Sequence, residues 1–354
     1  MKNKKVELTL LISVILISIF GILMIYSASS VWALYKFNDS YKFLKNQCLF
    51  FVIGLILLYF VSKVDYKKYY KYSNKVLLIS LILLILVLIP GIGTIRNGSR
   101  SWFGIGSFGI QPSEFAKLGL IIYVSKNIQN KSYIKILLIT LFIFGLIMLQ
   151  PDFGTGIIIV MSIIGIMFIS GLNIKIFIRF GILGLIGIIS LVLIAPYRLK
   201  RILSFLNPWS DPLGSGFQII QSLYSIGPGG LFGLGFGNSI QKHFYLPEPQ
   251  TDFIFSIISE EFGIFGIIIV SVLFVTIFYS SLKISIKCDD LFGKYLSFGI
   301  TFGLIFQTIL NLSVVVGLVP VTGVTLPFLS YGGSSLLITM ISVGIILNIS
   351  RHER

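Results

Sequence analysis

The sequence predicts an all-α, polytopic membrane protein with about ten transmembrane helices. Of its 354 residues, 55% are hydrophobic and only 12% are charged, and the mean hydropathy is +0.96. Apolar runs approaching the length that spans a bilayer, about 20 residues, recur along the whole chain. The runs are continuous rather than alternating, which argues against a transmembrane β-barrel. We therefore expect a single integral membrane domain over residues 1–354.

The expected spans are residues 8–26, 47–61, 76–89, 110–124, 136–149, 154–171, 176–195, 253–282, 295–316 and 334–349. An even number of spans places both termini on one side of the membrane. The termini and loops of that side carry about twice as many lysines and arginines as the opposite loops, so both termini are expected to be cytoplasmic. The same rule accounts for the net charge of +15, so no nucleic acid partner is expected.

The large outer loop, residues 196–252, connects spans seven and eight. It contains an apolar stretch, 219–226, followed by a glycine-rich run, 227–237. This loop is too polar to span a bilayer, so we expect a short interfacial or re-entrant helix shielded by protein or water. The glycine run lacks the lysine and serine or threonine of a phosphate-binding P-loop, and no organic cofactor is expected.

A polar segment meets an apolar one where this loop enters span eight. Pro247 and Pro249 keep the chain extended. Thr251 is expected to cap the helix, with Asp252 in its first turn at the positive end of the dipole. An acid in this place is suited to a polar, lipid-linked substrate. Capping alone explains Asp252 equally well.

Span four and the loop before it contain a second polar group. Pro112 is expected to begin the helix, and Glu114 and Lys117 lie three residues apart on one face. Charges inside a span are costly, so these two either neutralise each other or line a cavity that contacts a charged substrate. Trp102 is either an interfacial anchor, which the sequence favours, or a platform for a sugar ring.

Three further outer segments carry polar or helix-breaking residues. Asp152 is expected mainly to cap span six. Arg198, Lys200 and Arg201 follow span seven and suit either a pyrophosphate or an ordinary lipid head group, because a guanidinium group binds phosphate oxygens in pairs. Asn311 precedes the segment 320–335, which has two prolines and three glycines in an apolar stretch, a pattern typical of broken helices that line a substrate path.

Four segments, in order, resemble signatures of the SEDS (shape, elongation, division and sporulation) family, which includes FtsW, RodA and SpoVE. They are 111–114 (QPSE), 150–155 (QPDFGT), 246–255 (LPEPQTDFIF) with Glu260 and Glu261, and 320–335. The resemblance covers nearly the whole chain. Residues 207–209 (NPW) and 245–249 (YLPEP) are more similar to the FtsW/SpoVE branch than to the RodA branch.

The resemblance implies a peptidoglycan glycosyltransferase in the bacterial cell membrane, with an outward-facing active site, that polymerises lipid II during division or sporulation. It implies a class B penicillin-binding protein transpeptidase as partner, with other divisome or sporulation cell-wall proteins. Asp252 matches the family's essential acid. Trp102, Glu114 and Lys117 match its functional tryptophan and its cavity acid and base. The other substrate-binding candidates are Gln111, Asp152, Arg198, Arg201, Glu248, Glu260 and Ser330.

The expected chemistry is a single displacement that inverts the donor sugar. Asp252 would act as general base on the 4-hydroxyl of lipid II, and undecaprenyl pyrophosphate would leave. Arg198, Arg201 and Lys117 are candidate cations for the leaving group. The sequence shows no dedicated metal site, so Mg²⁺ or Mn²⁺ would be held jointly with phosphate oxygens. A lipid II flippase is the main alternative, and a non-catalytic scaffold is the second.

Overall fold

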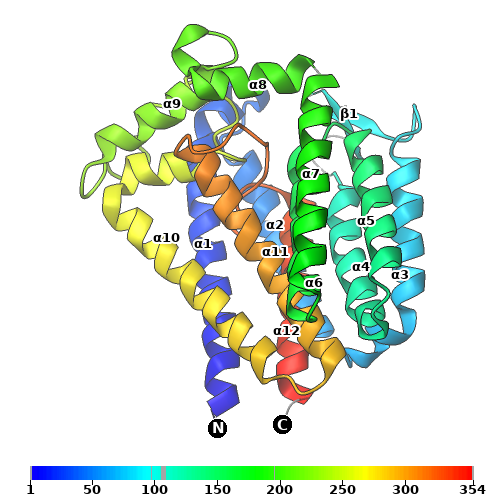
Figure 1. Ribbon diagram of the computed structural model, residues 1–354. Coiled ribbons are helices and arrows are strands. Elements are labelled where there is room, and N and C mark those ends of the chain that lie inside the picture. Colours follow the sequence, from blue (N-terminus) through cyan, green and yellow to red (C-terminus); the bar gives the residue numbers. More distant parts are fainter. Residues whose placement is uncertain (1, 97, 105–108, 195, 353–354) are drawn as a thin grey trace.

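The structure is a computed structural model that describes residues 2–96, 98–104, 109–194 and 196–352. Its helices run between two ends of a bundle, and both termini lie at the same end (Figure 1). The helices at the ten expected spans are α1 (Lys2–Phe37), α2 (Lys42–Val61), α3 (Lys67–Leu86), α4 (Pro112–Asn127), α5 (Tyr133–Met148), α6 (Phe153–Ile169), α7 (Ile174–Ile194), α10 (Ile254–Lys287), α11 (Leu291–Val315) and α12 (Gly333–His352).

The all-α membrane fold is confirmed. Within the described residues, six helices are long and apolar enough to cross a membrane, namely α1, α2, α3, α10, α11 and α12, and α5 and α6 are shorter apolar helices. Large apolar side chains such as Leu78 and Ile79 on α3 and Val275 on α10 are more than half exposed, as expected of a lipid-facing surface. The number of ten crossings stays a prediction.

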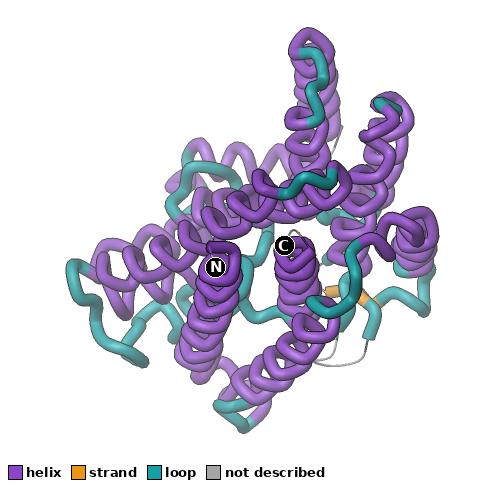
Figure 2. Tube along the Cα trace, turned by 90° about the horizontal axis from the view of Figure 1, so that it is seen from below, coloured by secondary structure: helices purple, strands orange, loops and turns teal. Residues whose placement is uncertain are grey.

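Helix α12 is the most deeply buried of the candidate spans and lies near the centre of the bundle when it is viewed from below (Figure 2). It packs mainly on α2, while α1 packs on α10 and α3 on α4. Small residues allow the close approach: a Cβ atom added at Gly344 would lie 2.9 Å from the carbonyl oxygen of Leu58. The bundle thus has a protein-packed centre and a lipid-facing rim.

The outer loop 196–252 contains two helices, α8 (Pro196–Leu206) and α9 (Phe217–Ile226), and two short 3₁₀ helices, η2 (Pro208–Ser210) and η3 (Gly227–Gly229). Figure 1 shows α8 and α9 lying across the end of the bundle opposite the termini. Helix α9 confirms the short helix expected at 219–226. Helix α8 was not expected, because its basic residues break any apolar run.

The other connections are short, except for a hairpin before α4. Strands β1 (Thr94–Arg96) and β2 (Ser99–Trp102) pair antiparallel, and η1 (Ile128–Asn130) follows α4. The hairpin was also not expected from the sequence. It brings Trp102 to the end of the bundle opposite the termini, ahead of the start of α4 at Pro112, which is confirmed as the first helical residue.

The start of α10 differs from the prediction. Its N-cap is Phe253, so Thr251 is not the cap and Asp252 lies in the turn before the helix. The Thr251 hydroxyl lies 2.8 Å from the carbonyl oxygen of Glu248 and 2.9 Å from Asp252 Oδ1, so its one proton is shared between these two acceptors. The Thr251 amide also donates to the Glu248 carbonyl, at 3.0 Å. The Thr251 side chain therefore stabilises this turn and does not cap α10.

Helix α10 is broken at Gly263, where φ is 59° and ψ is −150°. The glycine-rich segment 229–235 fills the break. The amides of Leu234 and Gly235 donate to the carbonyls of Glu260 and Glu261, at 2.9 and 3.0 Å. The amides of Ile264 and Phe265 donate back to the carbonyls of Gly230 and Leu231, at 3.0 and 3.2 Å. The outer loop therefore completes the hydrogen bonding of a membrane helix.

Replacing Gly263 by alanine is expected to destabilise the protein. The conformation is one that only glycine adopts readily, which alone costs about 1–3 kcal/mol. An added Cβ would also lie 2.6 Å from Gly229 O, Gly230 O and Gly233 N. Thermal unfolding in detergent should show a lower midpoint. The matched control is Gly145→Ala on α5, where an added Cβ meets nothing within 4 Å; equal midpoints for the two variants would contradict this account of the break.

Candidate functional site

Asp252 lies at the outer end of α10, at the end of the bundle opposite the termini. Its carboxylate accepts a hydrogen bond from the Thr251 hydroxyl at 2.9 Å, and its backbone carbonyl accepts one from Asn311 Nδ2 on α11 at 2.7 Å. Desolvation by the surrounding protein, helped by the negative charge of Glu248, raises the pKa of Asp252 to about 6. The Thr251 hydrogen bond and the positive charge of Arg201 oppose the rise. A carboxyl group with such a pKa can act as a general base near neutral pH.

A basic cleft lies beside this acid. It has a volume of about 410 Å³ and is lined by Lys200, Arg201, Gly214, Ser215, Gln218, Ile219 and Val321. Arg201 Nη1 donates to the carbonyl oxygen of Val321 at 3.2 Å, which ties α8 to the segment that follows α11. Lys200 Nζ lies 3.7 Å from Asp211, and both side chains are exposed. The cleft therefore presents two cations, and the charge of one of them, Arg201, acts on Asp252.

The extended segment 320–326, between α11 and α12, connects the polar groups of the site. Three of its backbone carbonyls accept hydrogen bonds from side chains on other elements. Val321 O binds Arg201, Val324 O binds Asn311 at 2.7 Å, and Thr325 O binds Gln307 at 2.9 Å. Pro320 and Gly323 keep the carbonyls of this segment out of regular secondary structure, and side chains of the neighbouring helices donate hydrogen bonds to them.

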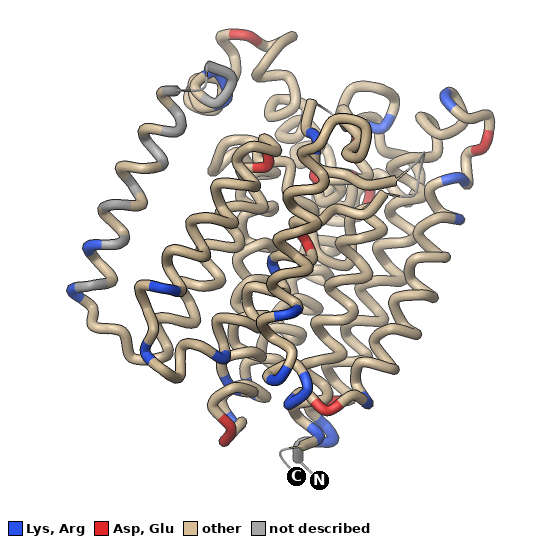
Figure 3. Tube along the Cα trace, turned by 90° about the vertical axis from the view of Figure 1, so that its right-hand side faces the viewer, with Lys and Arg blue, Asp and Glu red and all other residues tan. Residues whose placement is uncertain are grey.

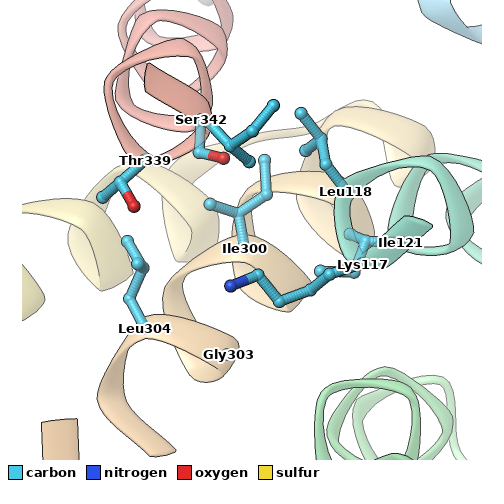
Figure 4. A pocket seen from close by; sticks show the side chains of 9 residues that line it. Lys117, Leu118, Ile121, Ile300, Gly303, Leu304, Thr339 and Ser342 are labelled. Atoms are coloured by element: carbon cyan, nitrogen blue, oxygen red, sulfur yellow. The ribbon is translucent and has the colours of Figure 1, made fainter. Parts of the chain in front are cut away.

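Glu114 and Lys117 form the buried ion pair that their spacing predicted. Lys117 Nζ lies 2.7 Å from Glu114 Oε2 and also donates to Gln307 Oε1 at 3.0 Å. Glu114 is 5% exposed and Lys117 is 9% exposed. Figure 4 shows Lys117 at a small cavity of about 20 Å³ between α4, α11 and α12, room for about one water molecule. The structure supports mutual neutralisation, and contact with substrate stays a prediction.

Asp152 and Gln111 form a third group. Asp152 Oδ1 accepts from the Thr155 amide at 3.2 Å, which confirms that Asp152 caps α6. Its Oδ2 accepts from Gln111 Nε2 at 2.9 Å and from the Ser113 hydroxyl at 3.4 Å. Burial raises the pKa of Asp152, and the charge of Glu114 raises it further. This acid therefore joins the starts of α4 and α6 near the ion pair of α4.

Glu260 lies under the outer loop and is almost completely buried. Its carboxylate accepts from the Ser239 hydroxyl at 2.5 Å and from the Ile240 amide at 2.9 Å. The neighbouring Glu261 accepts from the Ser27 hydroxyl at 2.5 Å and lies 3.5 Å from Lys242 Nζ. These contacts give both acids a structural role in holding the loop on α1 and α10. Substrate contact by Glu260 stays a prediction.

The remaining candidates lie at the same end of the bundle but are not all brought together. Glu248 is exposed in the turn before Asp252, and its charge acts on that acid. Trp102 is half-buried at the end of β2, and its carbonyl accepts from the Thr94 hydroxyl at 3.0 Å. Ser330 is buried and closes a turn by accepting from the Leu326 amide at 2.8 Å. Arg198 lies in α8, and its side chain falls outside the described part of the structure.

Two amide side chains on α11 matter more than the sequence suggested. Gln307 was not a candidate, although it links Lys117 to the carbonyl of Thr325. Asn311 lies four residues further along, on the same face of the helix. Asn311 is a candidate from the sequence, together with the segment 320–335, and the repeat of polar amides at this spacing in an apolar helix is the signal that could also have identified Gln307.

The donor groups do not form a metal site by themselves. Among the residues that the structure describes, no group of three or more His, Cys, Asp or Glu side chains is placed to hold a metal ion. A divalent ion bound next to Asp252 would need further ligands from a substrate, such as phosphate oxygens. Binding of Mg²⁺ or Mn²⁺ together with substrate phosphates is therefore a proposal.

The chain is similar to bacterial proteins over its whole length. The model of the cell cycle protein family FtsW/RodA/SpoVE matches residues 7–354. Stage V sporulation protein E of Bacillus subtilis (strain 168) is 50% identical over 362 residues, which cover 100% of this chain and 99% of that protein. A probable peptidoglycan glycosyltransferase FtsW of Trichlorobacter lovleyi is 41% identical, covering 97% and 93% of the two chains.

Solved structures show the same fold. A chain from a study titled "Structural coordination of polymerization and crosslinking by a peptidoglycan synthase complex" matches with a TM-score of 0.78 and 30% identity, covering 97% of both chains. The rod shape determining protein RodA of Thermus thermophilus matches with a TM-score of 0.73 and 28% identity, covering 97% of this chain and 96% of that one. The chain thus belongs to the FtsW/RodA/SpoVE family, the family that its four sequence signatures resemble.

Proposed function

We propose that the protein is a peptidoglycan glycosyltransferase that polymerises lipid II into glycan strands. The observation that carries this proposal is a carboxyl group with a pKa near 6, Asp252, placed beside a basic cleft at one end of a membrane bundle. Relatives at 37–41% identity bear the name probable peptidoglycan glycosyltransferase FtsW. The B. subtilis relative at 50% identity is a sporulation protein, so a role in division or in sporulation fits.

The site is proposed to face outward from the cytoplasmic membrane. Figure 3 shows more of the lysines and arginines at the end that holds both termini than at the opposite end. Basic residues collect on the cytoplasmic side of bacterial membrane proteins. Asp252, the basic cleft and α8 lie at the opposite end, where lipid II would present its sugars and pyrophosphate outside the cell.

The proposed reaction is a single displacement. Asp252 accepts the proton of the acceptor sugar's 4-hydroxyl while that oxygen forms a bond to the anomeric carbon of the lipid-linked donor. The bond from that carbon to the pyrophosphate oxygen breaks, and undecaprenyl pyrophosphate leaves with the electron pair. Attack from the face opposite the leaving group turns an α-linked donor into a β-linked glycan. A positioned base contributes about 10²–10⁴-fold to such a proton transfer.

Negative charge grows on the leaving pyrophosphate, and the basic cleft is proposed to receive it. Arg201 presents a guanidinium group that can bind two phosphate oxygens, and its link to Val321 fixes it relative to the 320–326 segment. Lys200 adds a second positive charge from the same helix. Cations placed in advance stabilise a developing charge better than water, which must reorient.

A class B penicillin-binding protein is the proposed partner. One of the matching structures is of a peptidoglycan synthase complex that coordinates polymerisation with crosslinking. Crosslinking is an acyl transfer that uses an activated nucleophile, and a separate transpeptidase is proposed to supply it. Divisome or sporulation cell-wall proteins would place the complex of this protein and its transpeptidase at the septum.

The test is polymerisation of purified lipid II by purified protein, with and without a class B penicillin-binding protein. Glycan strands detected by gel electrophoresis or mass spectrometry are the expected result. The competing function, a lipid II flippase, is measured in parallel with labelled lipid II in proteoliposomes. Transfer of lipid II across the bilayer without any glycan, in the presence or absence of the partner, would favour the flippase.

The rate of polymerisation is expected to depend on pH through Asp252. Only the ionised carboxylate can accept a proton, and its pKa is raised to about 6 from the usual 3.8. At lipid II concentrations well below KM, where the rate reports the protonation of the free enzyme, the rate should fall about tenfold per pH unit below pH 6 and level off above it. Initial rates measured in steps from about pH 4.5 to 8 check this. A rate that stays constant down to about pH 4.5 would exclude a base with this pKa.

A further inference from the structure

Asn311 on α11 forms a bridge between two backbone segments of the site. Its side chain is 1% exposed. Nδ2 donates to the carbonyl oxygen of Asp252 and to the carbonyl oxygen of Val324, both at 2.7 Å. Oδ1 has no hydrogen-bond partner among the described residues. Burying this unpaired oxygen costs free energy that an apolar residue at this position would not incur. We therefore attribute the role of the amide to the two hydrogen bonds of its Nδ2.

The bridge acts at a place where regular structure does not hold the chain. Asp252 precedes the first residue of α10, and Val324 lies in an extended segment without helix or strand. The hydroxyl of Thr251 contacts the Asp252 side chain, whereas Asn311 holds the main chain from which that side chain projects. Through Val321, the same extended segment also binds Arg201 of the basic cleft. The amide therefore links the position of the base to the position of the cleft.

We propose that Asn311 is a positioning residue for catalysis, which sets the distance between the Asp252 carboxylate and a substrate held by the basic cleft. The proposal rests on the proposed glycosyltransferase function. Asn311 does not touch the reacting atoms, and it acts through the backbone of Asp252. A misplacement of about 1 Å between reacting groups can lower the rate about 10²-fold. A bridge that fixes the position of Asp252 is therefore expected to have a large effect on the rate.

The test compares Asn311→Ala with Asn348→Ala. Asn348 on α12 is also 1% exposed, and its amide holds the carbonyl of Ser62 at 3.0 Å and the amide of Tyr66 at 2.9 Å. It makes the same kind of side-chain-to-backbone bonds at the cytoplasmic end, far from Asp252. Both variants are purified as folded monodisperse protein, and kcat and KM for lipid II are measured beside the thermal unfolding midpoint.

We expect Asn311→Ala to lower kcat by about 10–10²-fold while KM stays within about threefold of the wild type. Asn348→Ala should lower the unfolding midpoint without changing kcat. Equal kcat values for Asn311→Ala and the wild type would overturn the proposal. If the alanine variant does not fold, Asn311→Ser decides instead, because a hydroxyl can donate to only one of the two carbonyls and the same loss of kcat is expected.

The failure of this inference can be told apart from the failure of the proposed function. An inactive wild-type protein, with lipid II crossing the bilayer, contradicts both. An active wild type whose Asn311→Ala and Asn311→Ser variants keep full kcat contradicts only the positioning role. A kcat loss that is equally large in Asn348→Ala would assign the effect to general loosening of the bundle and would also overturn the positioning role.

Discussion

Replacing Asp252 by asparagine is expected to lower the rate of glycan polymerisation by about 10²–10⁴-fold, the contribution of a general base. The amide has nearly the same shape as the carboxyl group, and its oxygen can still accept the Thr251 hydrogen bond seen at 2.9 Å. The fold and the basic cleft should therefore be retained. The measurement is the initial rate of lipid II polymerisation, together with lipid II binding and the unfolding midpoint of the purified variant.

The matched control for this substitution is Asp39→Asn. Asp39 lies between α1 and α2 and pairs with Lys45 at 2.9 Å on the exposed surface. This control should polymerise lipid II at the wild-type rate. The residual activity of Asp252→Asn should also lose its dependence on pH near 6. An Asp252→Asn variant with wild-type activity would show that another group accepts the proton.

Replacing Lys117 by methionine is expected to destabilise the bundle by about 3–5 kcal/mol, because it leaves the buried charge of Glu114 uncompensated. Lys117 Nζ is 2.7 Å from Glu114 and 3.0 Å from Gln307, so the substitution also removes the link to the 320–326 segment. Chemical or thermal unfolding in detergent should show a markedly lower midpoint. Removing both charges, in Glu114→Gln with Lys117→Met, should recover most of the loss.

The control for the buried pair is an exposed one. Lys45→Met breaks an ion pair of similar length, 2.9 Å, in which the two side chains are 66% and 36% exposed. An exposed pair contributes about 1 kcal/mol or less, so this variant should unfold close to the wild type. If Lys117→Met proved no less stable than Lys45→Met, Glu114 would not depend on Lys117 for neutralisation, and the role given to Lys117 would be wrong.

The membrane helices could be predicted from the sequence because each depends on a continuous apolar run. Local polar signals also worked where they act within one turn: Pro112 begins α4, and Asp152 caps α6. The predicted capping role of Thr251 was wrong, because its hydroxyl lies at hydrogen-bond distance from the Glu248 carbonyl oxygen instead. A donor with two acceptors in reach cannot be assigned from sequence spacing alone.

The contacts that organise the site could not be predicted, because they join side chains to backbone groups far away in the chain. Gln307 and Asn311 bind carbonyls of the 320–326 segment, and a carbonyl group carries no residue-specific signal. The fit between the segment 229–235 and the break at Gly263 is likewise invisible, since one glycine among 35 does not reveal a helix break.

The broken helix α10 has a consequence for biogenesis. Its break leaves two carbonyls and two amides that only the segment 229–235 satisfies, and in hydrocarbon each such group unpaired costs several kcal/mol. This segment precedes α10 in the sequence, so it is synthesised first and its partner groups already exist when the helix forms. A connecting loop thus acts as the template on which the following helix takes its final shape.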